Sequence, residues 1–191
     1  MKTNLNYDMF VPTRTLFGAG TLNELHAQPM PGRKALLVIS NGRSTRANSY
    51  LSRTEEQLRM AGVETVLFDR VEANPLKSTV MAGGAMAREN GCDMIVALGG
   101  GSVMDAAKAI AVVASNGGDY WDYIPCGTGK GKAVAETPLP IVAITTTAGT
   151  GSETDAGCVI TNAETHEKTG FVHPGLFPVP VSYTHLRAHE T

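Results

Sequence analysis

The sequence predicts an α/β fold, built as a Rossmann-like parallel sheet with flanking helices. Short apolar runs alternate with amphipathic stretches along most of the chain, which is the pattern of βαβ units. The run at residues 34–40 is almost continuously apolar, as a parallel strand covered on both faces requires. Two turns rich in glycine and hydroxyl side chains, at residues 99–102 and 145–153, each follow a strand-like run. Because the carboxyl ends of neighbouring parallel strands share a crevice where ligands bind, the two turns are expected to meet there.

The expected elements follow in chain order. Short apolar runs closed by glycine or polar turns predict strands at residues 11–17, 34–40, 63–69, 93–98, 140–146 and 158–161. Apolar residues at helical spacing predict helices at residues 47–61, 75–90 and 103–114. Pro75 opens the second of these helices, and Gly62 and Gly91 end the first two. Residues 115–137 are rich in glycine and charge and predict a long loop.

The long loop carries three aromatic residues, Tyr120, Trp121 and Tyr123. Their rings could pack the loop against the sheet or stack on an adenine base. Packing is the favoured interpretation.

Composition limits the classes of function. The chain has 191 residues, a formal net charge of −2 and 18% charged residues, so it offers no basic face for nucleic acid. Its first residues lack the apolar core of a signal peptide, and no apolar run approaches the roughly 18 residues of a membrane-spanning helix. We therefore expect a soluble, cytoplasmic protein that binds neither nucleic acid nor membrane. Cys92, Cys126 and Cys158 are widely spaced without a CxxC pair, which predicts free thiols.

The glycine turn, residues 99–102, is the first candidate site. Gly99, Gly100 and Gly101 carry no Cβ, so their amides can come close to an anion and adopt positive φ where needed. Ser102 is expected to cap the following helix, with Asp105 three residues on as in a capping box. The turn predicts an anion site at a helix N-terminus; the alternative is a turn that binds nothing and lets the helix pack closely on the sheet. It matches neither GxGxxG nor a P-loop, which disfavours a triphosphate site of that type.

The threonine turn, residues 145–153, is the second candidate site and reads TTTAGTGSE. It supplies four threonine hydroxyls and one serine hydroxyl, groups that hydrogen-bond ribose and phosphate oxygens. The alternative is an ordinary polar loop in which serine or threonine caps a short helix.

Together these motifs resemble the iron-containing alcohol dehydrogenases, a family that includes lactaldehyde, 1,3-propanediol and butanol dehydrogenases. The resemblance is carried by residues 17–20 (FGAG), 74–75 (NP), 99–108 (GGGSVMDAAK), 145–153 and 173–178 (HPGLFP). Sugar-phosphate cyclases share the glycine motif but lack the threonine turn, so the dehydrogenases are favoured. The resemblance ends at residue 178 and implies a dinucleotide-binding domain over residues 1–178.

The resemblance implies roles for the residues of the glycine turn. Gly99, Gly100, Gly101 and Ser102 would receive the pyrophosphate of the dinucleotide, and Asp105 would brace the turn.

Further roles follow for residues outside that turn. Thr145, Thr146 and Thr150 would surround the ribose and phosphate on the nicotinamide side, and Asn74 would lie near the cofactor. Lys168 resembles a lysine that hydrogen-bonds the nicotinamide ribose, and the alternative for it is a solvated surface lysine.

The adenosine end departs from the best-known relatives, which place an aspartate after the first parallel strand to accept both ribose hydroxyls. Here the corresponding segment runs from Ser40 through Gly42 and Arg43 to Ser44. Without a carboxylate there is no repulsion toward a 2′-phosphate, and Arg43 and the two serine hydroxyls could donate to it. We therefore predict that NADP(H) is preferred over NAD(H).

In the family a divalent iron or zinc polarises the alcohol oxygen, and one Asp and three His of a helical C-terminal domain hold it. No residue of this chain matches those four ligands, so that domain is expected to be absent and the chain alone inactive. Residues 179–191 do not continue the resemblance and are expected to be a disordered or artefactual tail. His185 and His189 within it have a spacing that could chelate a metal on a helix, but a disordered tail is favoured.

We expect this chain to be the cofactor-binding part of an NAD(P)-dependent alcohol dehydrogenase. Its full-length form would interconvert primary alcohols or diols with aldehydes and would be a homo-oligomer. The alternative is a non-catalytic dinucleotide-binding module or a truncated product without function.

Overall fold

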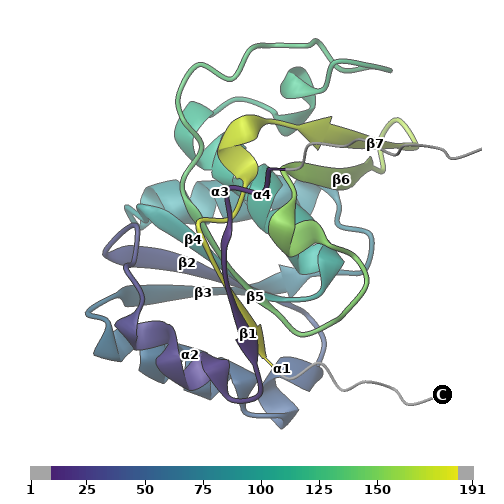
Figure 1. Ribbon diagram of the computed structural model, residues 1–191. Coiled ribbons are helices and arrows are strands. Elements are labelled where there is room, and N and C mark those ends of the chain that lie inside the picture. Colours follow the sequence, from purple (N-terminus) through teal and green to yellow (C-terminus); the bar gives the residue numbers. More distant parts are fainter. Residues whose placement is uncertain (1–9, 185–191) are drawn as a thin grey trace, which may run out of the picture.

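The computed structural model describes residues 10–184. Six parallel strands form one sheet in the order β1-β8-β5-β4-β2-β3, with helices on both faces (Figure 1). The strands are β1 (Arg14–Gly18), β2 (Lys34–Ser40), β3 (Glu64–Val71), β4 (Met94–Gly99), β5 (Ile141–Thr145) and β8 (Pro180–Thr184). All five neighbouring pairs are parallel. The predicted α/β fold with a parallel sheet is confirmed.

The helices divide between the two faces because the strand order reverses. They are η1 (Thr21–Ala27), α1 (Ser44–Ala47), α2 (Tyr50–Met60), α3 (Lys77–Glu89) and α4 (Gly101–Asn116). The connection from β2 to β3 runs toward one edge of the sheet. The connection from β3 to β4 passes back over β2, and the connection from β4 to β5 continues in that same direction. Right-handed crossovers in opposite directions place their helices on opposite faces. Accordingly α2 and η1 cover one face, α3 and α4 cover the other, and the order reverses between β2 and β4 (Figure 1).

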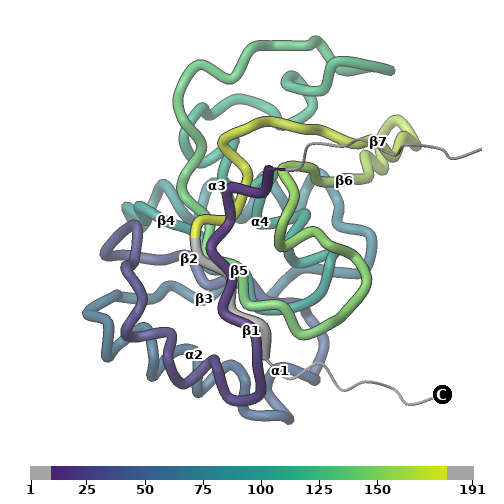
Figure 2. Tube along the Cα trace, in the orientation of Figure 1, coloured from purple at the N-terminus to yellow at the C-terminus, as the bar shows by residue number. Residues whose placement is uncertain are grey.

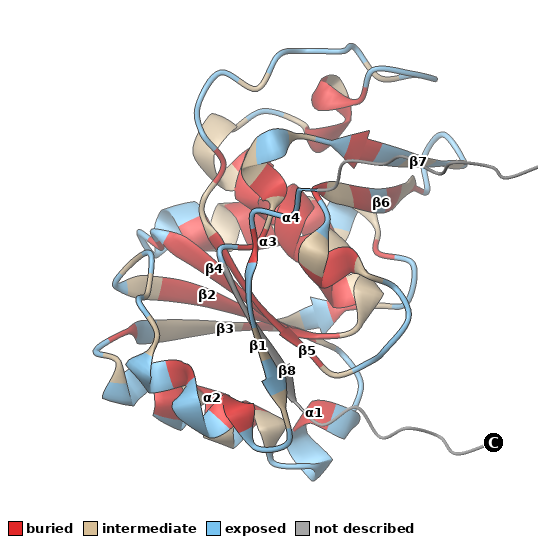
Figure 3. Ribbon diagram, in the orientation of Figure 1, coloured by how far each residue is buried: buried red, intermediate tan, exposed pale blue. Residues whose placement is uncertain are grey.

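The central strands fill two cores at once because alternate residues of a strand point to opposite faces. Toward α3 and α4 the strands direct Leu36, Val38, Ile95, Ala97, Ile141 and Ala143. Toward α2 and η1 they direct Leu37, Ile39, Val96, Leu98, Val142 and Ile144. Figure 3 shows the resulting band of buried residues through β2, β4, β5 and α4. A strand buried on both faces has no polar side to alternate with, which is why residues 34–40 read as one apolar run.

A small antiparallel hairpin packs on α4, made of β6 (Gly157–Asn162) and β7 (Glu167–Val172). The predicted long loop begins after α4 with a short 3-10 helix, η2 (Tyr120–Tyr123), and lies at the hairpin end of the molecule (Figure 2). Tyr120 is fully buried and its ring packs edge-on against Phe171. The Glu167 carboxylate accepts hydrogen bonds from Trp121 Nε1 and from the backbone N of Thr128. The aromatic residues therefore anchor the loop by packing.

Several boundaries differ from the sequence expectation. The first strand begins at Arg14 rather than at residue 11. The helix expected at residues 47–61 is interrupted, because Ser49 adopts a left-handed φ of 57° between α1 and α2. Strand β8 lies beyond residue 178, within the residues expected to form a tail, and pairs with β1 and β5. The expectation of a disordered tail is thus wrong for residues 180–184, because they complete the sheet. His185 and His189 lie outside the described residues.

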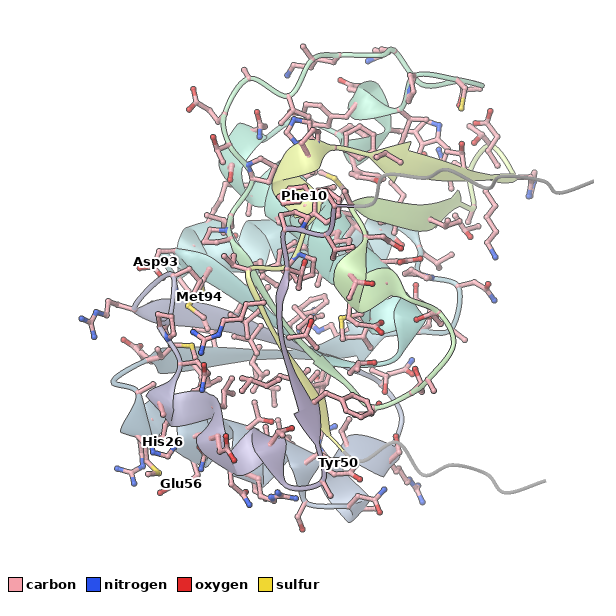
Figure 4. All side chains as sticks on the ribbon, in the orientation of Figure 1. Phe10, His26, Tyr50, Glu56, Asp93 and Met94 are labelled. Carbon is pink, nitrogen blue, oxygen red and sulfur yellow. The ribbon has the colours of Figure 1, made fainter. Side chains whose placement is uncertain are left out.

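The amino ends of the central strands are fastened by Asp93, which precedes β4. Its carboxylate accepts hydrogen bonds from the backbone N of Arg33 at 2.9 Å and of Lys34 at 2.8 Å. Figure 4 labels Asp93 and Met94 at this edge. These bonds tie the start of β2 to the start of β4 and so help to fix the register between the two strands.

We predict that Gly84→Val lowers the free energy of unfolding by about 2–3 kcal/mol. Gly84 lets α3 contact α4 closely, because a Cβ there would lie 2.3 Å from Val113 Cγ2, and Val113 is fully buried. Urea denaturation followed by circular dichroism measures the change. Ser78→Val is the matched control, since Ser78 is exposed on the same helix, and its change should stay within about 0.5 kcal/mol. Equal effects of the two variants would contradict the close-packing role.

Candidate functional site

The glycine turn joins β4 directly to α4. Gly100 is the N-cap residue, and its carbonyl accepts the amides of Val103 and Met104. The expectation that Ser102 caps α4 is wrong, because the chain enters the helix at Gly101 and Ser102 already lies in its first turn. No side chain caps this 16-residue helix. Its first amides and the positive end of its dipole therefore remain available to an anion.

The glycines allow close approach rather than positive φ. A Cβ on Gly100 would lie 2.9 Å from Thr147 Oγ1, and one on Gly101 would lie 2.9 Å from Thr150 Cγ2. The amide of Thr146 also donates to the carbonyl of Gly99 at 3.0 Å. Residues 99–101 all lie outside the positive-φ region. The glycine and threonine turns are thus in direct contact, as expected from neighbouring strands, and a side chain on either glycine would push them apart.

A crevice of about 570 Å³ opens at the carboxyl ends of β2, β3, β4 and β5. Both turns and the strand ends line it, through Ser40, Asn41, Gly42, Ser44, Thr45, Val71, Glu72, Ala73, Gly99, Gly100, Gly101, Ser102, Val103, Thr146, Thr147, Ala148 and Thr150. The crevice lies where the strand order reverses, the usual ligand position in such sheets. It unites the predicted adenosine segment, the glycine turn and two of the predicted threonines.

A second space, the hairpin cavity, measures about 430 Å³ and lies between α4 and the β6–β7 hairpin. Its lining residues are Gly101, Ser102, Asp105, Thr150, Ser152, Asp155, Gly157, Cys158, Val159, Gly170, Phe171 and Val172. Gly101, Ser102 and Thr150 line both spaces. The crevice and the hairpin cavity are therefore neighbours at the N-terminus of α4, and we refer to the two together as the elongated site.

Asp105 faces the hairpin cavity from α4. Its Oδ1 accepts a hydrogen bond from Ser152 Oγ at 3.0 Å, and its Oδ2 accepts one from the backbone N of Val159 at 3.1 Å. Burial raises the pKa of this carboxyl above its ordinary value, although the hydrogen bonds from Val159 and Ser152 oppose the shift. Asp105 thus joins α4 to the threonine turn and to β6. It forms no capping box with Ser102, which is not the cap.

Lys108 is a site residue that the sequence reasoning missed. Its side chain is fully buried, and Nζ donates to Ser152 O at 2.7 Å, Asp155 Oδ1 at 2.7 Å and Gly157 O at 2.8 Å. An ammonium is tolerated in a protein interior only when it is paired and hydrogen-bonded. The available signal was a lone lysine in the apolar helical stretch of residues 106–113 (AAKAIAVV).

Asn74 and Lys168 come together beside the glycine turn although they are distant in sequence. Lys168 Nζ, on β7, donates to Asn74 Oδ1 at 2.7 Å. The backbone N of Asn74 lies 3.4 Å from Ser102 Oγ, to which it donates. Asn74 adopts a φ of 57°, a left-handed conformation that asparagine tolerates better than most residues. Neither residue belongs to the two linings, but the backbone of Asn74 contacts Ser102, which belongs to both.

Two further predicted residues, Thr145 and Arg43, also line neither space. Thr145 is buried, and its Oγ1 donates to the carbonyl of Thr147 at 2.9 Å, so it stabilises the conformation of the threonine turn from within the protein. Arg43 is exposed at the start of α1 and does not line the crevice, whereas Ser40, Gly42 and Ser44 do. At the turn into α1, Arg43 therefore lies outside the crevice although its neighbours in sequence line it.

Residues 10–184 contain no group of three or more His, Cys, Asp or Glu placed to hold a metal ion. The described part of the chain therefore does not fit a divalent metal.

The three cysteines are free thiols, as expected, and burial raises the pKa of Cys158 to about 12, so its thiol stays protonated at neutral pH. Over residues 10–184, no helix combines the length and apolarity needed to cross a membrane.

The family model of iron-containing alcohol dehydrogenases matches residues 12–182. The chain belongs to this family. It is 38% identical over 173 residues to the probable NADH-dependent butanol dehydrogenase 1 of Bacillus subtilis, covering 91% of this chain and 43% of the relative. It is 39% identical over 165 residues to the 1,3-propanediol dehydrogenase of Klebsiella pneumoniae, covering 85% of this chain and 41% of the relative.

Solved structures of iron-containing alcohol dehydrogenases share the fold. The NADH-dependent butanol dehydrogenase A of Thermotoga maritima superposes with a TM-score of 0.85 at 32% identity, over 94% of this chain and 44% of that one. An archaeal alcohol dehydrogenase from a Red Sea brine pool gives a TM-score of 0.86 at 37% identity, over 95% and 47%. The family resemblance is thereby confirmed. The chain spans less than half the length of these relatives.

Proposed function

We propose that this chain binds a nicotinamide dinucleotide, with the pyrophosphate at the N-terminus of α4. The observation that carries the proposal is the junction of the crevice and the hairpin cavity at Gly101, Ser102 and Thr150. A dinucleotide is two nucleosides joined by a pyrophosphate, and this site has two spaces joined at an uncapped helix N-terminus. The Bacillus subtilis and Thermotoga maritima relatives are named as NADH-dependent butanol dehydrogenases, which supports the same ligand.

Each part of the site has a distinct task under this proposal. The backbone amides of the glycine turn and the hydroxyl of Ser102 donate to the pyrophosphate. Thr146 and Thr150 offer hydroxyls to the adjoining phosphate and ribose. Lys168, held by Asn74 beside Ser102, donates to the ribose on the nicotinamide side.

We further propose that the adenosine end favours NADP(H) over NAD(H). The segment of residues 40–45 that lines the crevice carries hydroxyls and no carboxylate. Glu72 also lines the crevice, but its Oε1 already accepts hydrogen bonds from the backbone N of Leu76 at 2.7 Å and from Thr79 Oγ1 at 3.0 Å. Glu72 is thus the single carboxylate of the described lining, and these hydrogen bonds hold it at the N-terminus of α3. Of the predicted donors, Ser40 and Ser44 lie in the crevice and Arg43 lies outside it.

Ser40→Asp is expected to shift the preference toward NADH by about tenfold, as the ratio of the two dissociation constants. The new carboxylate would accept the ribose hydroxyls of NADH and repel the 2′-phosphate of NADPH. Fluorescence titration with both reduced cofactors measures the ratio. Ser40→Ala is the control, because it removes the hydroxyl without adding charge. Tighter binding of NADH than of NADPH by the unchanged chain would contradict the proposed preference.

We also propose that the full-length protein transfers hydride between a primary alcohol or diol and the nicotinamide. The names of the butanol and propanediol dehydrogenases to which the chain is similar support this class of substrate. The described residues account for binding and orienting the cofactor. They contain no metal cluster, so no metal-dependent step is assigned to them.

Direct titration of the 191-residue chain tests the cofactor site. NADH is expected to bind with a dissociation constant on the order of micromolar, and ADP, which carries the adenosine and pyrophosphate alone, is expected to bind more weakly. With Fe²⁺ and either 1-butanol or 1,3-propanediol, this chain should bind NAD⁺ without reducing it. A folded chain that binds neither NADH nor ADP would refute the proposed site.

A further inference from the structure

We propose that Lys108 is a positioning residue for the nicotinamide half of the site, acting through Ser152 and Asp155. This inference rests on the proposed dinucleotide site and concerns which part of it the buried ammonium controls. Lys108 itself lines neither the crevice nor the hairpin cavity. Any influence on a ligand must therefore pass through the groups that it holds.

The ammonium of Lys108 joins several segments that are distant in sequence from α4. Ser152 Oγ lies 3.1 Å from Lys108 Nζ and 3.0 Å from Asp105 Oδ1, so this hydroxyl accepts from the lysine and donates to the carboxylate. The other partners are the carbonyl of Ser152, the Asp155 carboxylate and the carbonyl of Gly157 at the start of β6. One cation thus fastens the threonine turn and the hairpin to α4.

The partners of Lys108 form walls of the hairpin cavity. Ser152, Asp155 and Gly157 face the cavity from the threonine turn and β6, and Asp105 faces it from α4. The bonds to Lys108 therefore set the separation of these two walls. None of these four residues lines the crevice at the ends of β2 and β3. The direct hydrogen-bond partners of Lys108 therefore lie at one end of the elongated site and not at the other.

Removing the ammonium would affect its partners unequally. The Asp155 side chain is 53% exposed and would remain hydrated. The carbonyls of Ser152 and Gly157 would lose a charged donor, and an unpaired acceptor in a partly buried site destabilises the arrangement around it. The threonine turn and the first residues of β6 would then move relative to α4, which changes the shape of the hairpin cavity.

Lys108→Met removes the charge and keeps a similar unbranched side chain. On the 191-residue chain, NADH binding is measured by fluorescence titration and ADP binding by calorimetry. The dissociation constant for NADH is expected to rise at least about tenfold, and that for ADP to change less than about twofold, because ADP occupies only the crevice and the glycine turn. A lysine that only stabilised the fold would not change the dissociation constants of NADH and ADP to such different extents. Equal changes for both, or no change in a folded variant, would overturn the inference.

Asp155→Asn provides a second test that does not depend on the folding of Lys108→Met. It keeps an acceptor oxygen for Lys108 but removes the ion pair, and because the side chain is exposed we expect the variant to stay folded. The NADH constant should rise about three- to tenfold with ADP unchanged, and the absence of this difference would overturn the inference. Lys130→Met, at a lysine whose side chain is 71% exposed, is the matched control and should leave both constants unchanged. An unchanged chain that binds ADP but not NADH would refute the role of the hairpin cavity, whereas one that binds neither would refute the whole dinucleotide site.

Discussion

Gly101→Val is expected to abolish detectable binding of NADH while the chain remains folded. A Cβ at this position would lie 2.9 Å from Thr150 Cγ2, and valine adds two further carbons. Gly101 lines both the crevice and the hairpin cavity, so the new side chain would displace the threonine turn and fill the junction proposed for the pyrophosphate. The dissociation constant should rise at least about a hundredfold in a titration of NADH fluorescence.

Ser102→Ala is the control for this variant. It leaves the backbone amides of the glycine turn in place and adds no volume, and it removes one hydroxyl, which is also the acceptor for the backbone N of Asn74. We expect the affinity for NADH to fall by no more than about tenfold. A folded Gly101→Val chain with unchanged NADH affinity would show that the ligand lies elsewhere.

Tyr120→Ala is expected to lower the free energy of unfolding by about 3–5 kcal/mol. The ring is fully buried and packs edge-on against Phe171 on β7 at 6.2 Å and against Trp121 at 6.5 Å between centroids. Its hydroxyl lies 3.4 Å from Cys158 Sγ, and burial raises the pKa of this phenol well above its ordinary value. Truncation would leave a cavity where the long loop meets the hairpin. Urea denaturation followed by circular dichroism measures the loss.

Tyr120→Phe separates the ring from its hydroxyl. It keeps the packed volume and loses a single weak contact to sulfur, so it should cost about 1 kcal/mol or less. Tyr120 also lines neither the crevice nor the hairpin cavity. If Tyr120→Ala kept its stability but weakened NADH binding, the ring would be acting as a base-stacking platform instead of as core.

The fold was predictable wherever the signal was local. Strand β2 spans Lys34–Ser40, as the apolar run predicts, because each of its faces is covered by a helix layer. Strand β8 was not predictable in the same way, because its pairing with β1 joins residues about 165 positions apart and depends on the strand order of the whole sheet. Ser49 interrupts an expected helix because it adopts a left-handed φ, which could not be predicted from a serine at this position.

The candidate site divides in the same manner. The two turns were identifiable because glycine and threonine clusters after apolar runs have a direct conformational meaning. Arg43 does not line the crevice although Ser40, Gly42 and Ser44 do, and this was not predictable, since a side chain's direction at a loop-to-helix turn depends on backbone angles that the sequence does not display. Its contact with a 2′-phosphate stays a prediction. Lys108 was missed because its meaning comes from acceptors more than 40 residues further along the chain.

The sequence by itself determined the strands from β1 to β6, the three longer helices, the two turns and the family, because these depend on residue spacing and on motifs within short segments. Only the tertiary structure decided what these segments touch: the glycine turn against the threonine turn, Lys168 against Asn74, and Lys108 against the start of the hairpin. The physical reason is that hydrophobic periodicity and turn propensity are properties of a short segment and can be identified in its sequence alone. A shared crevice, by contrast, exists only after the sheet has brought its strand ends side by side.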